Sequence, residues 1–370
     1  ACLRRRIPFD SLNLTPIRSV SEPHPMTRWD QARQLFGLSR RPRGPVRHEA
    51  RDSARASVSS RPAAINAPPA VDSGAVSAPK APVGVKTARS VCIASGKGGT
   101  GKSSISASLA ALFARRGRTL LLDGDLGCAN AHILQNVHPK QSFADVIAGE
   151  VGLADIVTPC ANGVDLLAGG SGLARLAGLK TFELEMIGRG LDTLEPHYEH
   201  LVVDSAAGLS RQTVAFAVAC DATVVVTTPD VTAMTDAYAF IKVFVRQCEA
   251  QGIERPMPFI VVNRASSPAE AASVARRLEE VVYKFLGRKV ELIGELPEDR
   301  AVFRASQHRK TVVDAEPDAE VSRALQTLAN SVLSRLSLVN VKSRAGLGRD
   351  QGAGSSVGQR LAFGATRQKG

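Results

Sequence analysis

The stretch Gly96–Ser103 carries two lysines, Lys97 and Lys102, in one glycine-rich loop, G-K-G-G-T-G-K-S. It fits the phosphate-loop pattern G-x-x-x-x-G-K-[ST], follows an apolar run and opens a helical pattern. Backbone N–H groups close around phosphate oxygens in such loops, and the helix N-terminus adds positive potential. We therefore expect the loop to bind a nucleotide, a task that needs only one of the two lysines.

The predicted nucleotide site assigns a role to each residue of this loop. Lys102 contacts the β- and γ-phosphates, and the Ser103 hydroxyl ligates Mg²⁺. A glycine-rich turn with chance lysines is the alternative, and the strand–loop–helix context disfavours it. The other residues expected around the phosphates are Gly96, Lys97, Gly98, Gly99, Thr100, Gly101 and Ser104.

Three aspartates follow apolar runs that have the character of buried strands. Asp123 and Asp125 flank a glycine after T-L-L-L, and Asp204 ends H-L-V-V-D, which fits a Walker B strand. Asp125 is placed to orient or deprotonate an attacking water, although each aspartate alone could instead cap the next helix. The predicted metal ligands are Ser103, Asp123, Asp125 and Asp204, and the predicted catalytic residues are Lys97, Lys102 and Asp125.

The base of the nucleotide needs a separate pocket. Asn263 ends the run F-I-V-V-N, and its amide offers the donor and the acceptor that an adenine edge requires. An Asx turn explains Asn263 equally well. The stretch L-P-E-D, Leu296–Asp299, is the candidate opposite wall. The predicted base-binding residues are Asn263, Arg264, Pro297 and Asp299.

Parallel strands would bring these residues together at one sheet edge. From Ser90 onward, short continuous apolar runs alternate with helix-length segments. Continuous runs are typical of strands covered on both faces, so the pattern predicts an α/β fold with a doubly wound, mostly parallel twisted sheet and helices on both faces. The predicted helices include residues 102–115, 232–251, 268–286 and 318–338.

The net charge of +12 is unevenly distributed. Residues 1–90 hold 16 basic and 6 acidic residues, and residues 341–370 hold 6 and 1, whereas residues 91–340 hold 25 basic against 28 acidic. The basic character therefore belongs to the two ends of the chain. We expect no sequence-specific DNA binding by the folded core.

Composition divides the chain into four parts. The N-terminal tail contains a short helical candidate, residues 26–38, and the linker that follows is rich in Pro, Ala, Ser and Arg, which predicts disorder. The expected parts are the tail at 1–40, the linker at 41–89, the nucleotide-binding domain at 90–340 and a basic flexible tail at 341–370.

The cysteines and the N-terminus predict a cytoplasmic protein. The six cysteines are scattered without a C-x-x-C pair, as is usual for the reducing cytosol. No apolar run approaches the roughly 20 residues of a membrane span, and no secretory signal is expected. Met26 is a candidate start residue, which would place residues 1–25 upstream of the natural chain.

The phosphate loop and the aspartate segments together resemble the MinD/ParA-type deviant Walker A P-loop ATPases. K-G-G-T-G-K-S is similar to their Walker A, D-G-D-L-G-C-A-N to their switch I and V-V-D-S-A-A-G to their switch II. The resemblance implies ATP or ADP and Mg²⁺ as ligands and an ATP-dependent homodimer. It also implies that Lys97 reaches the partner's phosphates, so that a weak ATPase activity depends on dimerisation.

Further stretches resemble the FlhG branch of this family, also called FleN or YlxH, which regulates flagellar number and placement. They are Leu166–Leu179, Thr227–Phe244 and Asp30–Leu35, the last reading D-Q-A-R-Q-L. This last motif implies a signal-recognition-type GTPase of the FlhF kind as a partner, although Phe36 stands where an arginine is expected. The branch also implies flagellar switch (C-ring) proteins or a flagellar transcription regulator as partners.

The C-terminal tail is a weak candidate for the membrane-targeting helix of the family. Val357, Leu361 and Ala365 recur at i+4 spacing among basic residues. An anionic membrane surface, the inner face of the cell membrane, is therefore a further candidate partner.

Two other functions fit the same residues. A MinD/ParA-type ATPase could position another cargo, in division-site selection or in plasmid or chromosome partition. A non-hydrolysing scaffold that only binds ATP is disfavoured because the loop lysine, the loop serine and the two key aspartates are all intact.

Overall fold

The computed structural model describes residues 88–126, 129–170, 179–345, 357 and 360–361. All of them belong to the larger of two units in the chain, residues 68–370. The helix expected at 26–38 and the Asp30–Leu35 motif lie outside the described residues, as does nearly all of the linker expected at 41–89.

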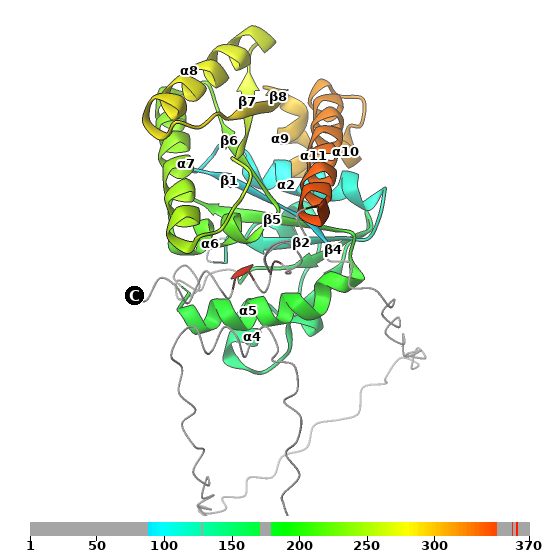
Figure 1. Cartoon of the computed structure of the whole chain (residues 1–370). Helices are drawn as coiled ribbons and strands as arrows, with labels where there is room; N and C mark the ends of the chain where they lie inside the picture. The colour runs from blue at the N-terminus through cyan, green and yellow to red at the C-terminus, as the bar shows by residue number, and fades with distance from the viewer. Residues whose placement is uncertain (1–87, 127–128, 171–178, 346–356, 358–359, 362–370) are drawn as a thin grey trace, which may run out of the picture. The chain divides into compact units, whose positions relative to one another are not determined.

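An eight-stranded sheet forms the centre of the described part, in the order β3-β4-β2-β5-β1-β6-β7-β8 (Figure 1). Neighbouring strands pair in parallel except β3 and β4, which are antiparallel at one edge. The predicted doubly wound, mostly parallel sheet is confirmed. The strands are β1 (Arg89–Ser95), β2 (Thr119–Gly124), β3 (Val157–Pro159), β4 (Val164–Leu167), β5 (His200–Ala207), β6 (Ala222–Thr227), β7 (Phe259–Ala265) and β8 (Glu291–Pro297).

Helices cover both faces of this sheet and enclose two separate cores (Figure 1). One face carries α2 (Lys102–Ala114), α3 (Ala131–Leu134), α9 (Arg300–Gln307), α10 (Val312–Ala315) and α11 (Glu320–Ala345). The other carries α4 (Phe143–Ala148), α5 (Thr181–Leu194), α6 (Arg211–Ala219), α7 (Val231–Gln251) and α8 (Pro268–Leu286). Short 3₁₀ turns lie at Leu153–Ile156 and Glu195–His197.

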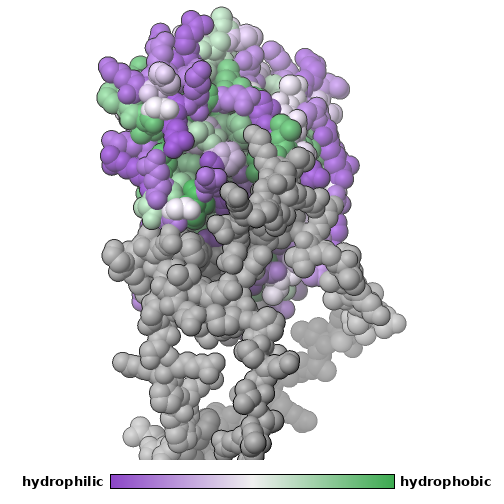
Figure 2. All heavy atoms as spheres, in the orientation of Figure 1, coloured by the Kyte–Doolittle hydropathy of each residue, from purple (hydrophilic) through white to green (hydrophobic). Residues whose placement is uncertain are grey.

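The continuous apolar runs follow from this two-sided burial. Val91 and Ile93 of β1 pack into the core under α2, whereas Cys92 and Ala94 pack into the opposite core. All four are fully buried, so each apolar side chain stabilises the fold, by about 1.5–3 kcal/mol for the larger ones. The outer surface in Figure 2 is largely hydrophilic, with smaller hydrophobic areas between the polar side chains.

Local end signals explain why some helices were predictable. α8 has the predicted bounds because Ser267 caps its first turn, Pro268 opens it and Gly287 ends it at a φ of 62°. α11 instead continues past the predicted end at Leu338 to Ala345. The strand β3 and the helices α5 and α6 were not among the elements predicted from the sequence.

Three described residues near the C-terminus pack against the sheet assembly. Val357 and Leu361 are fully buried in the core under α6 and α7. Arg360 forms an ion pair of 2.9 Å with Asp221, which follows α6. Two members of the stripe considered for a membrane therefore face the protein core in this structure, and Ala365 lies outside the described residues. Across the described part, no helix combines the length and the apolar character that crossing a bilayer requires.

Candidate nucleotide-binding site

The phosphate loop connects the carboxyl end of β1 to the first residue of α2, Lys102 (Figure 1). Gly99 and Gly101 adopt positive φ angles of 78° and 93°, which turn successive backbone N–H groups toward one concavity. Thr100 between them is 2% exposed, and its hydroxyl has no hydrogen-bond partner in the structure. A buried hydroxyl without a partner, in a glycine-rich loop that opens a helix, fits a ligand rich in acceptor oxygens, such as phosphate.

Two glycines of the loop are required by close neighbours. A Cβ on Gly96 would lie 2.0 Å from the backbone oxygen of Asp236 in α7, and one on Gly101 would lie 2.3 Å from Asn263 Nδ2. A Cβ on Gly98 meets nothing within 4 Å. The loop is thus held between α7 and β7, which fixes where the phosphates would sit.

Lys102 is the buried cation of the site, with 8% of the residue exposed. Burial lowers the pKa of Lys102, and the nearby Asp204 and Asp125 carboxylates partly counteract this. A buried ammonium close to two carboxylates is available to a phosphate group, and the role of Lys102 at the β- and γ-phosphates stays a prediction.

Asp123, near the end of β2, lies opposite Asp204 of β5, a strand that continues for three residues beyond Asp204. Burial raises the pKa of both carboxyl groups, and the mutual repulsion of the two carboxylates raises that of Asp123 further. Hydrogen bonds from Ser103 and Ser106 lower the pKa of Asp204 in part. Two buried acids at this position would be stabilised in their charged form by a cation.

The oxygen donors near the loop fit a magnesium ion whose remaining ligands are phosphate oxygens of the nucleotide and water. Within the described ranges, no three His, Cys, Asp or Glu side chains lie together as ligands for a metal ion. Mg²⁺ is commonly held by one or two protein groups plus phosphate oxygens and water. Ser103 and Asp204, which are hydrogen-bonded to each other, offer such a pair next to the loop.

Asp123 and Asp125 differ in their surroundings. Asp123 accepts hydrogen bonds from the backbone N–H of Ala131 at 3.0 Å and of Asp125 at 3.2 Å, so both of its oxygens bind the segment after β2. Asp125 is half-buried and close enough to raise the pKa of Lys102. Asp123 therefore fixes the backbone of the segment that follows β2, and Asp125 lies near Lys102 of the phosphate loop.

The predicted base-binding residues lie on two neighbouring strand ends. Asn263 Nδ2 donates to the backbone oxygen of Thr100 at 2.8 Å, so this donor binds the phosphate loop in the structure. Arg264 has a φ of 57°, a left-handed conformation that costs a non-glycine residue about 1–2 kcal/mol. Pro297 pairs with Ala265 at the end of β8. Asp299 caps α9 by accepting from Ala301 N at 2.8 Å.

Lys97 makes hydrogen bonds with two residues at the start of α7. Its side chain is 41% exposed, and Nζ lies 2.7 Å from Asp230 Oδ2 and also donates to Thr232 Oγ1. Asp230 is the N-cap of α7. Asp230 and Thr232 were not among the predicted site residues, although both stand in the T-T-P-D-V-T stretch that carries the FlhG resemblance.

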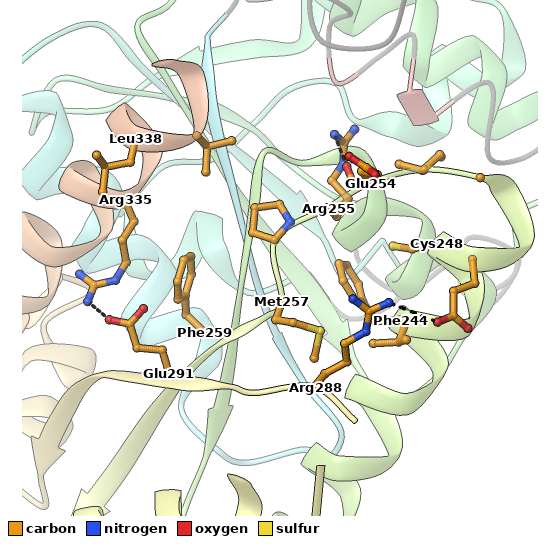
Figure 3. Close-up of a pocket in the computed structure, with 16 residues that line it drawn as sticks. Phe244, Cys248, Glu254, Arg255, Met257, Phe259, Arg288, Glu291, Arg335 and Leu338 are labelled. Carbon is orange, nitrogen blue, oxygen red and sulfur yellow. Dashed lines mark hydrogen bonds and ion pairs between the residues drawn. The ribbon is translucent and has the colours of Figure 1, made fainter. Parts of the chain in front are cut away.

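A cavity of about 830 Å³ lies away from these residues, at the start of β7 and β8 (Figure 3). Phe259 and Met257 contribute to its apolar lining. Four of its charged side chains form ion pairs, Arg335 with Glu291 and Arg288 with Glu249 at 3.8 Å. None of the predicted site residues lines this cavity.

Comparison with known proteins assigns residues 91–312 to the CobQ/CobB/MinD/ParA nucleotide-binding domain. The chain is 32% identical over 243 residues to the antiactivator FleN of Pseudomonas aeruginosa, an alignment covering 65% of this chain and 85% of FleN. It is 30% identical over 252 residues to the flagellum site-determining protein YlxH of Helicobacter pylori, covering 66% and 82%.

The fold has close counterparts among solved structures. The septum site-determining protein MinD of Pyrococcus horikoshii, solved with Mg-ADP, superposes with a TM-score of 0.54 at 22% identity. The superposition covers 71% of this chain and all of the MinD chain. At this level of identity, the likeness shows the fold.

Proposed function

The chain belongs to the CobQ/CobB/MinD/ParA nucleotide-binding family and is a P-loop ATPase of the FlhG/MinD/ParA type, and from this premise we propose that it is an ATP-controlled, dimerising switch. ATP and Mg²⁺ drive two copies together, and slow hydrolysis separates them. The observation that carries the proposal is the contrast between Lys102, which is buried among carboxylates, and Lys97, which stays 41% exposed.

Each residue of the site has a part in this cycle. The loop amides and Lys102 hold the phosphates, Ser103 and Asp204 hold Mg²⁺, and Asp125 orients the attacking water. The metal supplies charge neutralisation at the transferring phosphoryl group. We propose that Asn263, Arg264 and Pro297, at the neighbouring ends of β7 and β8, hold the base of the nucleotide.

Lys97 acts across the dimer in this proposal. A cation supplied by a second copy stabilises the charge on the transferring group and makes hydrolysis conditional on association. Two apolar side chains that follow the carboxyl ends of strands are exposed to solvent. Leu209, after β5, is 45% exposed, and Val231, after β6, is 67% exposed. A second copy of the chain is the partner that would cover them.

The cellular role that we propose is regulation of flagellar number and placement. The name of YlxH, a flagellum site-determining protein, supports a flagellar role, and the alignments cover 82% of YlxH and 85% of the antiactivator FleN. We further propose an FlhF-type GTPase as a partner of Asp30–Leu35, flagellar C-ring proteins or a transcription regulator as cargo, and peripheral binding to the inner face of the membrane. A pull-down with ATP-locked Asp125→Ala protein tests these partners.

The ATPase rate against protein concentration tests the switch. We expect the rate per subunit of the wild type to rise with concentration toward a plateau. Lys97→Ala should bind ATP without this rise, and Lys102→Ala should fail to bind ATP. A wild-type rate that is strictly proportional to protein concentration, together with an unaffected Lys97→Ala variant, would contradict the proposal.

A second candidate function keeps the same ATPase cycle with another cargo. The stretch Leu296–Ser306, L-P-E-D-R-A-V-F-R-A-S, supports it because it resembles the corresponding MinD stretch. Recovery of division-site or partition proteins, instead of flagellar proteins, in the Asp125→Ala pull-down would favour this candidate.

A further inference from the structure

Two side chains at the start of α7, those of Asp230 and Thr232, bind the Lys97 ammonium. The ammonium contacts Asp230 Oδ2 at 2.7 Å and also donates to Thr232 Oγ1. Asp230 accepts from Thr232 N at 2.9 Å, and the Thr232 hydroxyl donates to Asp230 Oδ2 at 3.0 Å. The two acceptors are therefore fixed by the helix N-terminus before the lysine reaches them.

The backbone around Lys97 is held against the same helix. The α7 backbone at Asp236 leaves no room for a Cβ on Gly96, the residue before the lysine. On the other side, Ser95 Oγ donates to the backbone oxygen of Lys97 at 2.6 Å. Because the loop backbone is fixed on both sides, the position of Lys97 Nζ depends on its side-chain partners.

We propose that Asp230 and Thr232 are positioning residues that hold Lys97 on its own subunit until a second copy presents its nucleotide phosphates. The inference rests on the proposed function for its last step only. Holding the lysine in the monomer is a property of this chain alone, and release to the partner is what the dimer adds.

The ion pair between Lys97 and Asp230 is weak enough for phosphates to replace the carboxylate. The side chains of Lys97 and Asp230 are 41% and 50% exposed, so water and salt screen their attraction. The phosphates of ATP carry several negative charges and compete well with one screened carboxylate. The hydrogen bonds from Lys97 and Thr232 lower the pKa of Asp230 to about 2, so the carboxylate stays charged at physiological pH.

A plain helix-capping role for Asp230 is the competing explanation, and one substitution separates the two. Asparagine caps helices about as well as aspartate, so Asp230→Asn keeps the cap and removes the charge. Glu249→Gln is the matched control, because Glu249 is an exposed carboxylate near the other end of α7 that faces Arg288 at 3.8 Å.

The first test uses the nucleotide-free protein at concentrations that keep it monomeric. The acylation rate of Lys97 by a water-soluble amine reagent is followed by mass spectrometry of its peptide. Because ion pairing shields the amine, we expect Asp230→Asn to raise this rate by up to about 5-fold, with a smaller rise in Thr232→Val and none in Glu249→Gln. An equal rate in the wild type and Asp230→Asn would overturn the inference, whatever the ATPase assays show.

The second test measures release in the dimer. Self-association with a non-hydrolysable ATP analogue is followed by sedimentation, and we expect the midpoint concentration of Asp230→Asn to fall by up to about 5-fold. In the Lys97→Ala background, the same substitution should leave the midpoint unchanged. A higher midpoint in Asp230→Asn would contradict release from Asp230. A wild type that never associates would contradict the proposed function. The acylation rates would still show whether Asp230 and Thr232 hold Lys97 in the monomer.

Discussion

Substitution of Gly96 by alanine tests how tightly the phosphate loop is held against α7. The added Cβ would lie 2.0 Å from the backbone oxygen of Asp236 and 2.2 Å from its carbonyl carbon. Relief requires a backbone movement of about 1 Å, because carbon–oxygen contacts below about 3 Å are not tolerated. Since backbone lies on both sides of the clash, no side-chain rotation can relieve it.

The expected cost of Gly96→Ala is about 1–3 kcal/mol of unfolding free energy, the usual range for overpacking. Displacing one loop N–H from a phosphate oxygen costs a further charge-assisted hydrogen bond of about 1.5–3 kcal/mol, which weakens nucleotide binding about 10- to 100-fold. Urea unfolding followed by circular dichroism measures the first effect, and titration with a fluorescent ADP in the presence of Mg²⁺ measures the second.

Gly98→Ala is the internal control for this prediction. A Cβ at Gly98 meets nothing within 4 Å, so its unfolding free energy should stay within about 0.5 kcal/mol of the wild type. If Gly96→Ala were as stable as Gly98→Ala and bound nucleotide as well as the wild type does, the close packing of the loop against α7 would be wrong.

Three further predictions concern other parts of the molecule. Asn263→Ala removes the 2.8 Å bond to Thr100 O and should destabilise the nucleotide-free protein by about 1 kcal/mol in urea unfolding, whereas an unchanged midpoint would refute this. Arg360→Ala leaves the mostly buried Asp221 without its cation and should cost about 3 kcal/mol in the same assay; a loss below 0.5 kcal/mol, the scatter of surface substitutions, would show that the contact is not made. Asp204→Asn should make the rise in Tm given by ADP independent of Mg²⁺, whereas in the wild type chelation of Mg²⁺ should reduce that rise.

The sequence predicted those parts of the site that are local in the chain. The loop from Gly96 to Ser103 and the strand that carries Asp204 are each specified by a few consecutive residues, so their positions follow from strand and helix patterns. The bond between Lys97 and Asp230 joins residues 133 positions apart. No spacing rule reports such a contact, because only the sheet order brings the ends of β1 and β6 together.

The C-terminal stripe shows a second limit of pattern reading. The i+4 spacing of Val357 and Leu361 predicts one apolar face but does not say which apolar surface covers it. In the structure, the core under α6 and α7 covers both residues, and Arg360 between them pairs with Asp221. The short edge strand β3 escaped prediction for a related reason, since three residues are too few to show a period.

Complementation between two inactive variants tests most directly whether Lys97 acts across the dimer. Lys97→Ala keeps Asp125 but lacks the donated lysine, and Asp125→Ala donates the lysine but cannot complete hydrolysis. In an equal mixture, random pairing makes half of the dimers mixed, and each mixed dimer has one complete site out of two. If Lys97 acts across the dimer, the mixture should reach about one quarter of the wild-type rate. A rate equal to the average of the two separate variants would contradict it.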